Sequence, residues 1–417
     1  MAKLALLKFD GNFEQGFVVT LQILEDGCFP FIEISGKLPP APEIYQHYKS
    51  WQLGYYKLGS SLRKLEARFQ EVSNFSLVDI KKESQIFSYS LNAWLDCDEF
   101  RRINEQLWVN LDPSDEFRVL IQAGDTRLRQ LPWHLWKFFE IYSKAEVAFS
   151  AREYARAKNL APIIPINKVR ILAILGDSRG INIHKDTTLL AHLPNAETIF
   201  LVEPNRKELY AYLYDEQGWD ILFFAGHSES YDSFALGRIY INRRDSLTIS
   251  DLKYALIKAI ERGLKLAIFN SCDGLGLVNE LEDLNIPQVI AMRQPVPDLV
   301  AQEFLKYFLV AFSSGKSLYT SVREARERLQ GLEEEFPCAS WLPVISQNPA
   351  EVPVTWQELQ PKKNTISSEV KGLLKNQFLL TYALSIALLC GQIVFNIRDN
   401  SVKPFISRDV TQCVRQD

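Results

Sequence analysis

A histidine and a cysteine, His227 and Cys272, each follow a short apolar run of this chain. The first run covers residues 221–225, and the second covers residues 264–269. An imidazole that lies beside a thiol can take its proton, and the resulting thiolate attacks carbonyl carbon atoms. These residue types therefore predict a cysteine nucleophile with a histidine as its base, provided that the fold brings the two together.

The two apolar runs are typical of neighbouring strands in a parallel sheet, because each is short, continuous and rich in β-favouring residues. A helical segment lies between them. Since the carboxyl ends of the strands carry the site in α/β sheets, we expect His227 and Cys272 to lie side by side there. Backbone N–H groups of Cys272 and of Ser228 or Gly226 are the expected oxyanion hole.

Predicted strands and helices alternate from residue 168 onward. In addition to the two runs, the predicted strands cover residues 169–175, 196–202, 287–292 and 341–345. This alternation predicts an α/β fold, with a mainly parallel sheet and helices on both faces. We place the domain at residues 111–350, with a further strand at residues 117–122.

A small α+β region precedes this domain, at residues 1–110. It begins with β-like runs separated by turn residues, which predict an antiparallel meander, and continues with helical sequence. The β-like runs cover residues 4–9, 16–23 and 29–34, and the helical stretches cover about residues 44–72 and 77–108. No acids, bases or metal ligands cluster here, so we expect a regulatory or partner-docking role. The sequence leaves open whether this region folds alone or packs onto the rest.

Composition argues against several classes of protein. A formal net charge of −4 at pH 7 gives no reason to expect a nucleic-acid partner. The six cysteines are scattered, without a CxxC pair or zinc-ligand spacing to the five histidines. No phosphate-binding or dinucleotide-binding glycine motif is present. We therefore expect no disulfide framework, no metal and no cofactor.

The end of the sequence predicts a membrane anchor. Residues 351–375 form a polar linker, and residues 376–397 contain no charged side chain. At about 1.5 Å per residue, a helix of this length covers the roughly 30 Å of a bilayer core. We expect one transmembrane helix, followed by a short tail at residues 398–417. Because no signal peptide is seen at the N-terminus, the large domain should stay cytoplasmic. The alternative is a helix buried in a globular core.

Two motifs of this chain resemble those of CHAT domains, which are bacterial relatives of caspases and separase in clan CD. They are Phe-Phe-Ala-Gly-His-Ser and Phe-Asn-Ser-Cys-Asp-Gly, and the similarity covers about residues 117–346. The residues that carry it are 131–135, 223–228, 269–274 and 285–298. The resemblance implies a caspase-hemoglobinase fold and an endopeptidase dyad of Cys272 and His227. It also implies a protein or peptide substrate and regulation by a protein partner.

In caspase-like folds, the loop after the first strand and the surroundings of the nucleophile shape the pocket for the residue before the cut. Asp177 and Asp273 occupy those places here. Their carboxylates would suit a Lys or Arg side chain through charge-assisted hydrogen bonds. The alternative is that both residues serve only as turns or caps.

Other functions fit the same residues. A catalytically silent scaffold, tethered to the membrane, could use the same fold for protein interactions. A thiol hydrolase or acyltransferase acting on small molecules is a third reading, which the resemblance disfavours. The sequence names neither the substrate nor the activating signal.

Overall fold

The computed structural model describes residues 3–58, 77–156, 168–230, 237–271 and 274–360. All of them belong to one compact unit. The linker after residue 360, the predicted transmembrane helix at 376–397 and the tail at 398–417 lie outside the described residues. Within the described part of the chain, no helix has the length and apolar character needed to cross a membrane.

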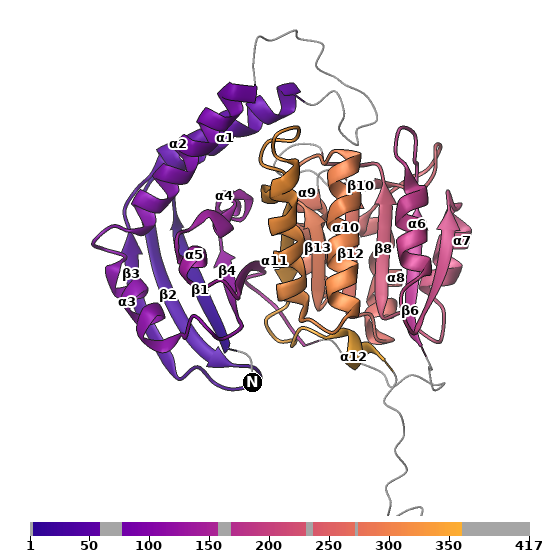
Figure 1. Ribbon diagram of the computed structural model, residues 1–417. Coiled ribbons are helices and arrows are strands. Elements are labelled where there is room, and N and C mark those ends of the chain that lie inside the picture. The colour runs from indigo at the N-terminus through magenta and orange to yellow at the C-terminus, as the bar shows by residue number, and fades with distance from the viewer. Residues whose placement is uncertain (1–2, 59–76, 157–167, 231–236, 272–273, 361–417) are drawn as a thin grey trace, which may run out of the picture. The chain divides into compact units, whose positions relative to one another are not determined.

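One large sheet organises the described residues (Figure 1). Its strands are, in spatial order, β3 (Ile32–Leu38), β2 (Gly16–Glu25), β1 (Lys3–Asn12), β4 (Phe117–Ala123), β5 (Ala145–Ser150), β14 (Pro343–Gln347), β13 (Gln288–Met292), β12 (Leu266–Ser271), β8 (Ile221–Gly226), β6 (Val169–Leu175) and β7 (Ala196–Val202). A small second sheet contains β9 (Ser228–Ser230), β10 (Gly237–Tyr240) and β11 (Ser246–Thr248).

Most neighbouring strands of the large sheet are parallel, as the sequence predicts. One parallel block runs from β1 through β4 and β5 to β14, and another runs from β13 through β12, β8 and β6 to β7. The blocks meet where β14 pairs antiparallel with β13. Every residue of β4, β5, β6, β8, β12, β13 and β14 is buried, which explains why these strands are mainly apolar and do not alternate with polar residues.

Strand β14 joins the two halves of the sheet. It lies between β5 and β13, although it is the last strand in sequence. Its pairing with β5 shows one register pair, Ser346 with Phe149. Beside this join, Arg326 and Glu146 form a buried ion pair of 2.8 Å. This ion pair connects helix α11 to β5, the strand with which β14 pairs.

Helices connect and cover the strands. They are α1 (Pro42–Leu58), α2 (Leu77–Leu95), α3 (Arg101–Asn110), α4 (Thr126–Gln130), α5 (Phe138–Ile141), α6 (Ile183–Ala191), α7 (Arg206–Leu213), α8 (Ile249–Glu261), α9 (Gly274–Glu282), α10 (Asp298–Ser313), α11 (Leu318–Arg328) and α12 (Trp356–Leu359), with 3₁₀ turns η1 (Trp133–Leu135), η2 (Leu329–Leu332) and η3 (Ala339–Trp341). Helices α6, α10 and α11 lie side by side on one face of the second block, whereas α8 and α9 lie behind it (Figure 1).

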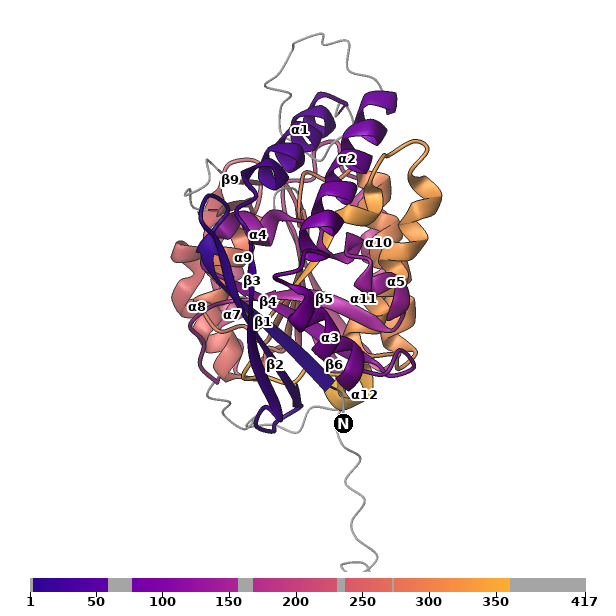
Figure 2. The same cartoon turned by 90° about the vertical axis from the view of Figure 1, so that its left-hand side faces the viewer.

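The N-terminal strands extend the same sheet (Figure 2). β1, β2 and β3 form the predicted antiparallel meander, and β1 also pairs with β4 in parallel over seven residues, from Lys3 with Phe117 to Phe9 with Ala123. The sequence left open whether residues 1–110 pack onto the rest. In the structure, the backbone of the first strand is hydrogen-bonded to the larger domain.

Two N-terminal elements differ from their prediction. The third strand begins at Ile32, not at residue 29, because Pro30 has no N–H for the ladder and Phe29 points into solvent with 93% exposure. The helical stretch at 77–108 is two helices, α2 and α3, which are separated by a turn at residues 96–100.

Candidate active site

Strands β8 and β12 lie side by side and run parallel, with Gly226 paired to Ser271. The residues that follow in sequence are His227 and Cys272. The prediction that these two strands are neighbours is therefore confirmed. Cys272 and Asp273 lie outside the described residues, so the structure gives the register of the two strands and the position of His227.

His227 is buried, with 2% of its surface exposed. Its Nε2 atom lies 2.8 Å from the backbone carbonyl oxygen of Arg179. Because a carbonyl oxygen only accepts hydrogen bonds, the ring hydrogen belongs on Nε2, which leaves the lone pair of the neutral ring on Nδ1. This is the tautomer that a base needs if its Nδ1 atom faces a thiol.

The loop after β6 holds the backbone of His227 as well as its ring. The N–H group of His227 donates to the carbonyl oxygen of Asp177 at 3.2 Å, and the N–H group of Tyr240 donates to the carbonyl oxygen of His227 at 3.0 Å. The histidine is therefore fixed from two sides, by the β6 loop and by strand β10.

Asp177 is fully buried and is bound by its own loop. Arg179 donates to its carboxylate from Nη2 at 2.7 Å and from Nε at 3.1 Å. Burial by itself raises the pKa of Asp177, but the hydrogen bonds from the side chain and N–H group of Arg179 outweigh it. The pKa of this carboxyl therefore lies below its usual value. A substrate group that binds Asp177 would therefore meet a carboxylate that Arg179 already holds.

Two glycines allow the loops to approach. A Cβ atom on Gly176 would lie 2.2 Å from the carbonyl oxygen of Tyr240, which leaves no space for a side chain. A Cβ atom on Gly226 would lie 3.2 Å from the Cα atom of Gly176. Larger residues at these positions would push the loop that carries Arg179 away from His227.

Ser228 links the histidine strand to the cysteine strand. Its hydroxyl group donates to the hydroxyl oxygen of Ser271 at 3.0 Å, and both residues are buried. The bond ties the residue after His227 to the residue before Cys272. Whether the N–H groups of Ser228, Gly226 and Cys272 form an oxyanion hole stays a prediction.

Helix α9 begins at Gly274, tightly against β13. A Cβ atom on Gly274 would lie 2.7 Å from the Cβ atom of Ala291 and 2.9 Å from the carbonyl oxygen of Met292. The end of β13 therefore determines where α9 can start.

Helix α1 reaches the loop that follows β13. The side chain of Gln294, 3% exposed, donates to the hydroxyl of Tyr48 at 2.8 Å and accepts from the amide of Gln52 at 3.0 Å. Tyr55 donates to the carbonyl oxygen of Pro295 at 2.8 Å. No local sequence pattern predicts these contacts, because they join residues about 240 positions apart.

Arg293, the residue before Gln294, is buried without a carboxylate partner among the described residues. Its Nη1 atom donates to the carbonyl oxygens of Gln130 and Leu131, and its Nε atom donates to that of Trp341. Burial lowers the pKa of Arg293 to about 10, so the side chain stays charged at neutral pH. It ties the β13 loop to the segment after α4.

In the part of the chain that the structure describes, no three His, Cys, Asp or Glu side chains are arranged to hold a metal ion.

A family model, the CHAT domain, matches residues 99–356 of this chain. The match covers more than half of the sequence and includes both the histidine and the cysteine motif. None of the curated proteins matches the chain in sequence.

Solved structures are similar over part of the chain. The Arg specific cysteine proteinase gingipain R has a TM-score of 0.39 and 8% identity, with 61% of this chain and 68% of that chain covered. The Drosophila initiator caspase Dronc has a TM-score of 0.35 and 10% identity, with 52% and 94% covered. A structure described only as a protease has a TM-score of 0.42 and 9% identity, with 64% and 69% covered.

Proposed function

This chain belongs to the CHAT domain family, and from that premise we propose that it is a caspase-like cysteine endopeptidase with Cys272 as nucleophile and His227 as base. The observation that carries the proposal is the arrangement around His227. Its ring is buried and bound at Nε2, and its strand is in register with the strand that leads into Cys272.

In the first step, Nδ1 of His227 takes the thiol proton as the sulfur of Cys272 attacks the carbonyl carbon of the peptide bond. Backbone N–H groups of Cys272 and of Ser228 or Gly226 donate to the oxygen that becomes negative. The proton then passes from His227 to the leaving amine, and the C–N bond breaks. A thioester on Cys272 remains.

In the second step, His227 accepts a proton from a water molecule that attacks the thioester carbon. The C–S bond breaks, and the proton on His227 returns to the sulfur as the acid product leaves. The carbonyl group of Arg179 accepts from Nε2 throughout, so each proton transfer takes place at Nδ1.

We also propose a preference for Lys or Arg before the cut, through Asp177 and Asp273. Arg179 already pairs with Asp177, so a basic side chain of the substrate would compete with Arg179 for this carboxylate. Asp273 is then the carboxylate that must provide most of the attraction.

The proposed enzyme is anchored in the membrane by residues 376–397, with the peptidase domain in the cytoplasm. If so, the full chain stays in the membrane pellet after carbonate extraction, whereas a chain that ends at residue 360 is released. Extraction of the full chain by carbonate would contradict the anchor.

The test of the peptidase proposal uses the full-length protein and its Cys272→Ala and His227→Ala variants. Each is incubated with fluorogenic peptides that have Lys, Arg, Asp or Leu before the cut, and with a thiol-directed covalent probe. We expect cleavage after Lys or Arg that both substitutions abolish. Ser50→Ala, a change on the exposed face of α1, is the matched control and should retain the activity.

The results of this test distinguish the dyad, the basic pocket and the scaffold alternative from one another. Cleavage that survives Cys272→Ala would contradict the dyad. A preference for Asp or Leu would contradict the basic pocket but keep the enzyme. A folded protein that neither cleaves nor reacts with the probe would favour the membrane-tethered scaffold.

A further inference from the structure

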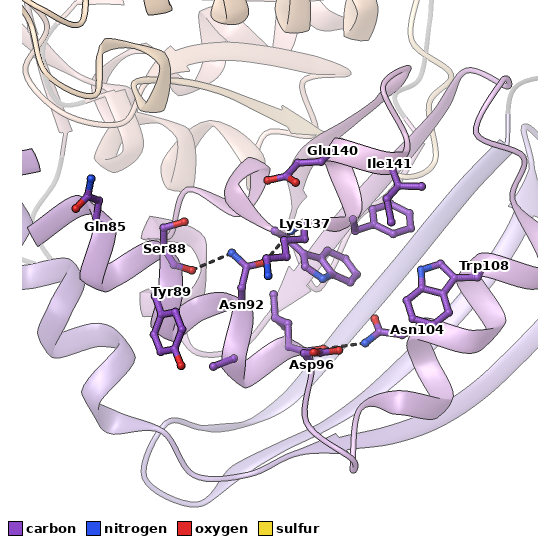
Figure 3. Close-up of a pocket in the computed structure, with 14 residues that line it drawn as sticks. Gln85, Ser88, Tyr89, Asn92, Asp96, Asn104, Trp108, Lys137, Glu140 and Ile141 are labelled. Atoms are coloured by element: carbon purple, nitrogen blue, oxygen red, sulfur yellow. Dashed lines mark hydrogen bonds between the residues drawn. The ribbon is translucent and has the colours of Figure 1, made fainter. Parts of the chain in front are cut away.

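A hollow of about 650 Å³ lies between α2, α3 and the η1–α5 segment (Figure 3). None of the residues proposed for catalysis lines it. Its volume falls in the range of pockets that hold a small ligand or a few side chains of a partner. Its lining residues are Gln85, Ser88, Tyr89, Asn92, Ala93, Leu95, Asp96, Asn104, Trp108, Trp136, Lys137, Phe138, Glu140 and Ile141.

The hollow has an aromatic floor and an exposed apolar margin. Trp136 and Phe138 are buried and stack with their ring centroids 4.7 Å apart. Around them, Tyr89, Trp108 and Ile141 are 78%, 51% and 56% exposed. Large apolar side chains that are exposed together, around a concave surface, are typical of a site for another molecule.

The walls are held in place by hydrogen bonds from two asparagine side chains. The amide of Asn92 in α2 donates to the carbonyl oxygen of Leu135 at 2.9 Å and accepts from the N–H group of Lys137 at 2.8 Å. Asn104 in α3 donates to the carbonyl oxygen of Leu95 at 2.8 Å. Three separate elements are therefore fixed around the hollow before anything binds, which lowers the entropy cost of binding.

The charged side chains that line the hollow carry a net negative charge. Asp96 follows the end of α2, and Glu140 lies in α5. Figure 3 shows them at opposite margins of the group. Neither has an ion pair with another described residue. Lys137 precedes Glu140 by three positions and partly offsets its charge, so Asp96 is the carboxylate of the hollow that has no cation among the described residues.

We propose that this hollow docks a segment of a partner protein that presents an apolar or aromatic side chain next to Lys or Arg. The apolar side chain packs on Trp136 and Phe138, and the basic group pairs with Asp96 while its aliphatic part lies along Trp108. An acidic segment would meet two carboxylates at once. The proposal does not depend on peptidase activity.

The test uses fluorescein-labelled octapeptides and the full-length protein, with binding followed by fluorescence anisotropy up to about 1 mM. One peptide has a central Leu-Trp pair between two lysines, and its counterpart has glutamates in place of the lysines. We expect the lysine peptide to bind about tenfold more tightly than the glutamate peptide.

Three variants locate the contact. Trp108→Ala should weaken binding of the lysine peptide about tenfold, because it removes an aromatic anchor. Asp96→Asn should weaken it about fivefold, and only at low salt. Glu105→Gln is the matched control, since it removes an exposed carboxylate from the same helix as Trp108 but outside the hollow, and it should have no effect.

Several results would overturn the proposal. They are equal binding of the two peptides, no binding of the lysine peptide at 1 mM, or equal weakening by Glu105→Gln and Asp96→Asn. Sedimentation that shows a dimer of the wild type, dissolved by Trp108→Ala, would instead assign the hollow to a second copy of this chain.

Discussion

At the scale of single residues, Arg179 connects two parts of the candidate site. Its guanidinium group binds the carboxylate of Asp177, and its carbonyl oxygen accepts from Nε2 of His227. One residue therefore neutralises a buried charge and orients the histidine. The sequence did not indicate this second role, because any residue type has a backbone carbonyl.

Replacing Arg179 with Gln should leave the buried carboxylate of Asp177 without its cation. We expect a loss of about 1–3 kcal/mol in the free energy of unfolding at pH 7, measured by urea denaturation. Because the pKa of Asp177 is lowered in the folded wild type, its carboxylate stabilises the fold at pH values above the ordinary carboxyl pKa. This stabilisation is lost as the pH falls through the pKa of the folded state. The two proteins should therefore converge in acid.

The control for this change is Arg243→Gln. Arg243 is an exposed arginine that lies 3.7 Å from Glu203, and its loss should cost less than about 0.5 kcal/mol. An equal loss in both variants, or a difference that persists at low pH, would show that Asp177 is not held in this way.

Asp220, the residue before β8, is expected to give the opposite dependence of stability on pH. Burial raises its pKa from 3.8 to about 6, although the N–H group of Arg170 donates to it at 2.8 Å. The folded state therefore holds the carboxyl proton of Asp220 more tightly than the unfolded state does, so the free energy of unfolding falls as the pH rises from about 4 to 6.

Asp220→Asn keeps an acceptor for that N–H group and removes the charge. Relative to the wild type, the variant should gain about 3 kcal/mol of stability between pH 4 and pH 7. Urea denaturation at both pH values measures this gain. Asp283→Asn, an exposed change, should show no gain, and a parallel pH profile for Asp220→Asn would contradict the assignment.

At the scale of elements, helix α1 is the least expected neighbour of the candidate site. Its tyrosine and glutamine side chains hold Gln294 and Pro295, directly after the strand against which α9 begins. Helix α1 therefore contacts the loop that follows β13, and β13 is the neighbour of β12, the strand that leads into the predicted nucleophile.

Gln294→Ala should remove this contact and take one hydrogen-bond partner from the hydroxyl of Tyr48 and one from the amide of Gln52. We expect a loss of about 1–3 kcal/mol in the free energy of unfolding, measured by thermal or urea denaturation. If the proposed dyad is active, the probe should also label Cys272 more slowly. Gln46→Ala, an exposed change on α1, is the control, and equal effects of the two changes would contradict the coupling.

The strands of the second block could be predicted well from sequence. β6 and β7 have the predicted bounds of residues 169–175 and 196–202, because both are rich in β-favouring apolar residues. β5 could not be predicted, since it is short and contains Glu146. That residue is tolerated in a buried strand because Arg326, 180 positions later, pairs with it.

The candidate site also has a part that could be predicted from the sequence and a part that could not. The approach of the histidine and cysteine strands follows from local sequence, and the register of Gly226 with Ser271 confirms it. The contacts of Arg179, Ser271 and α1 depend on tertiary structure. No local pattern could have indicated them.

At the scale of the whole unit, residues 1–110 complete the sheet. Strand β4 is buried along its full length and pairs with β1 on one side. A chain that begins at residue 111 would expose this edge and the apolar face under α1 and α2. We expect it to aggregate, whereas a chain of residues 1–360 should stay monomeric in size-exclusion chromatography. A monomeric, folded chain of 111–360 would contradict this.

The central position of β14 has a consequence for biosynthesis. Translation delivers the β5 edge by Ser150 and the β13 edge by Met292, but the strand between them only at residues 343–347. The nascent chain must therefore carry two unfinished half-sheets, with two open edges facing each other, until nearly the whole unit has been made. Early termination would leave both edges bare, and chaperones that cover strand edges would be needed most in this interval.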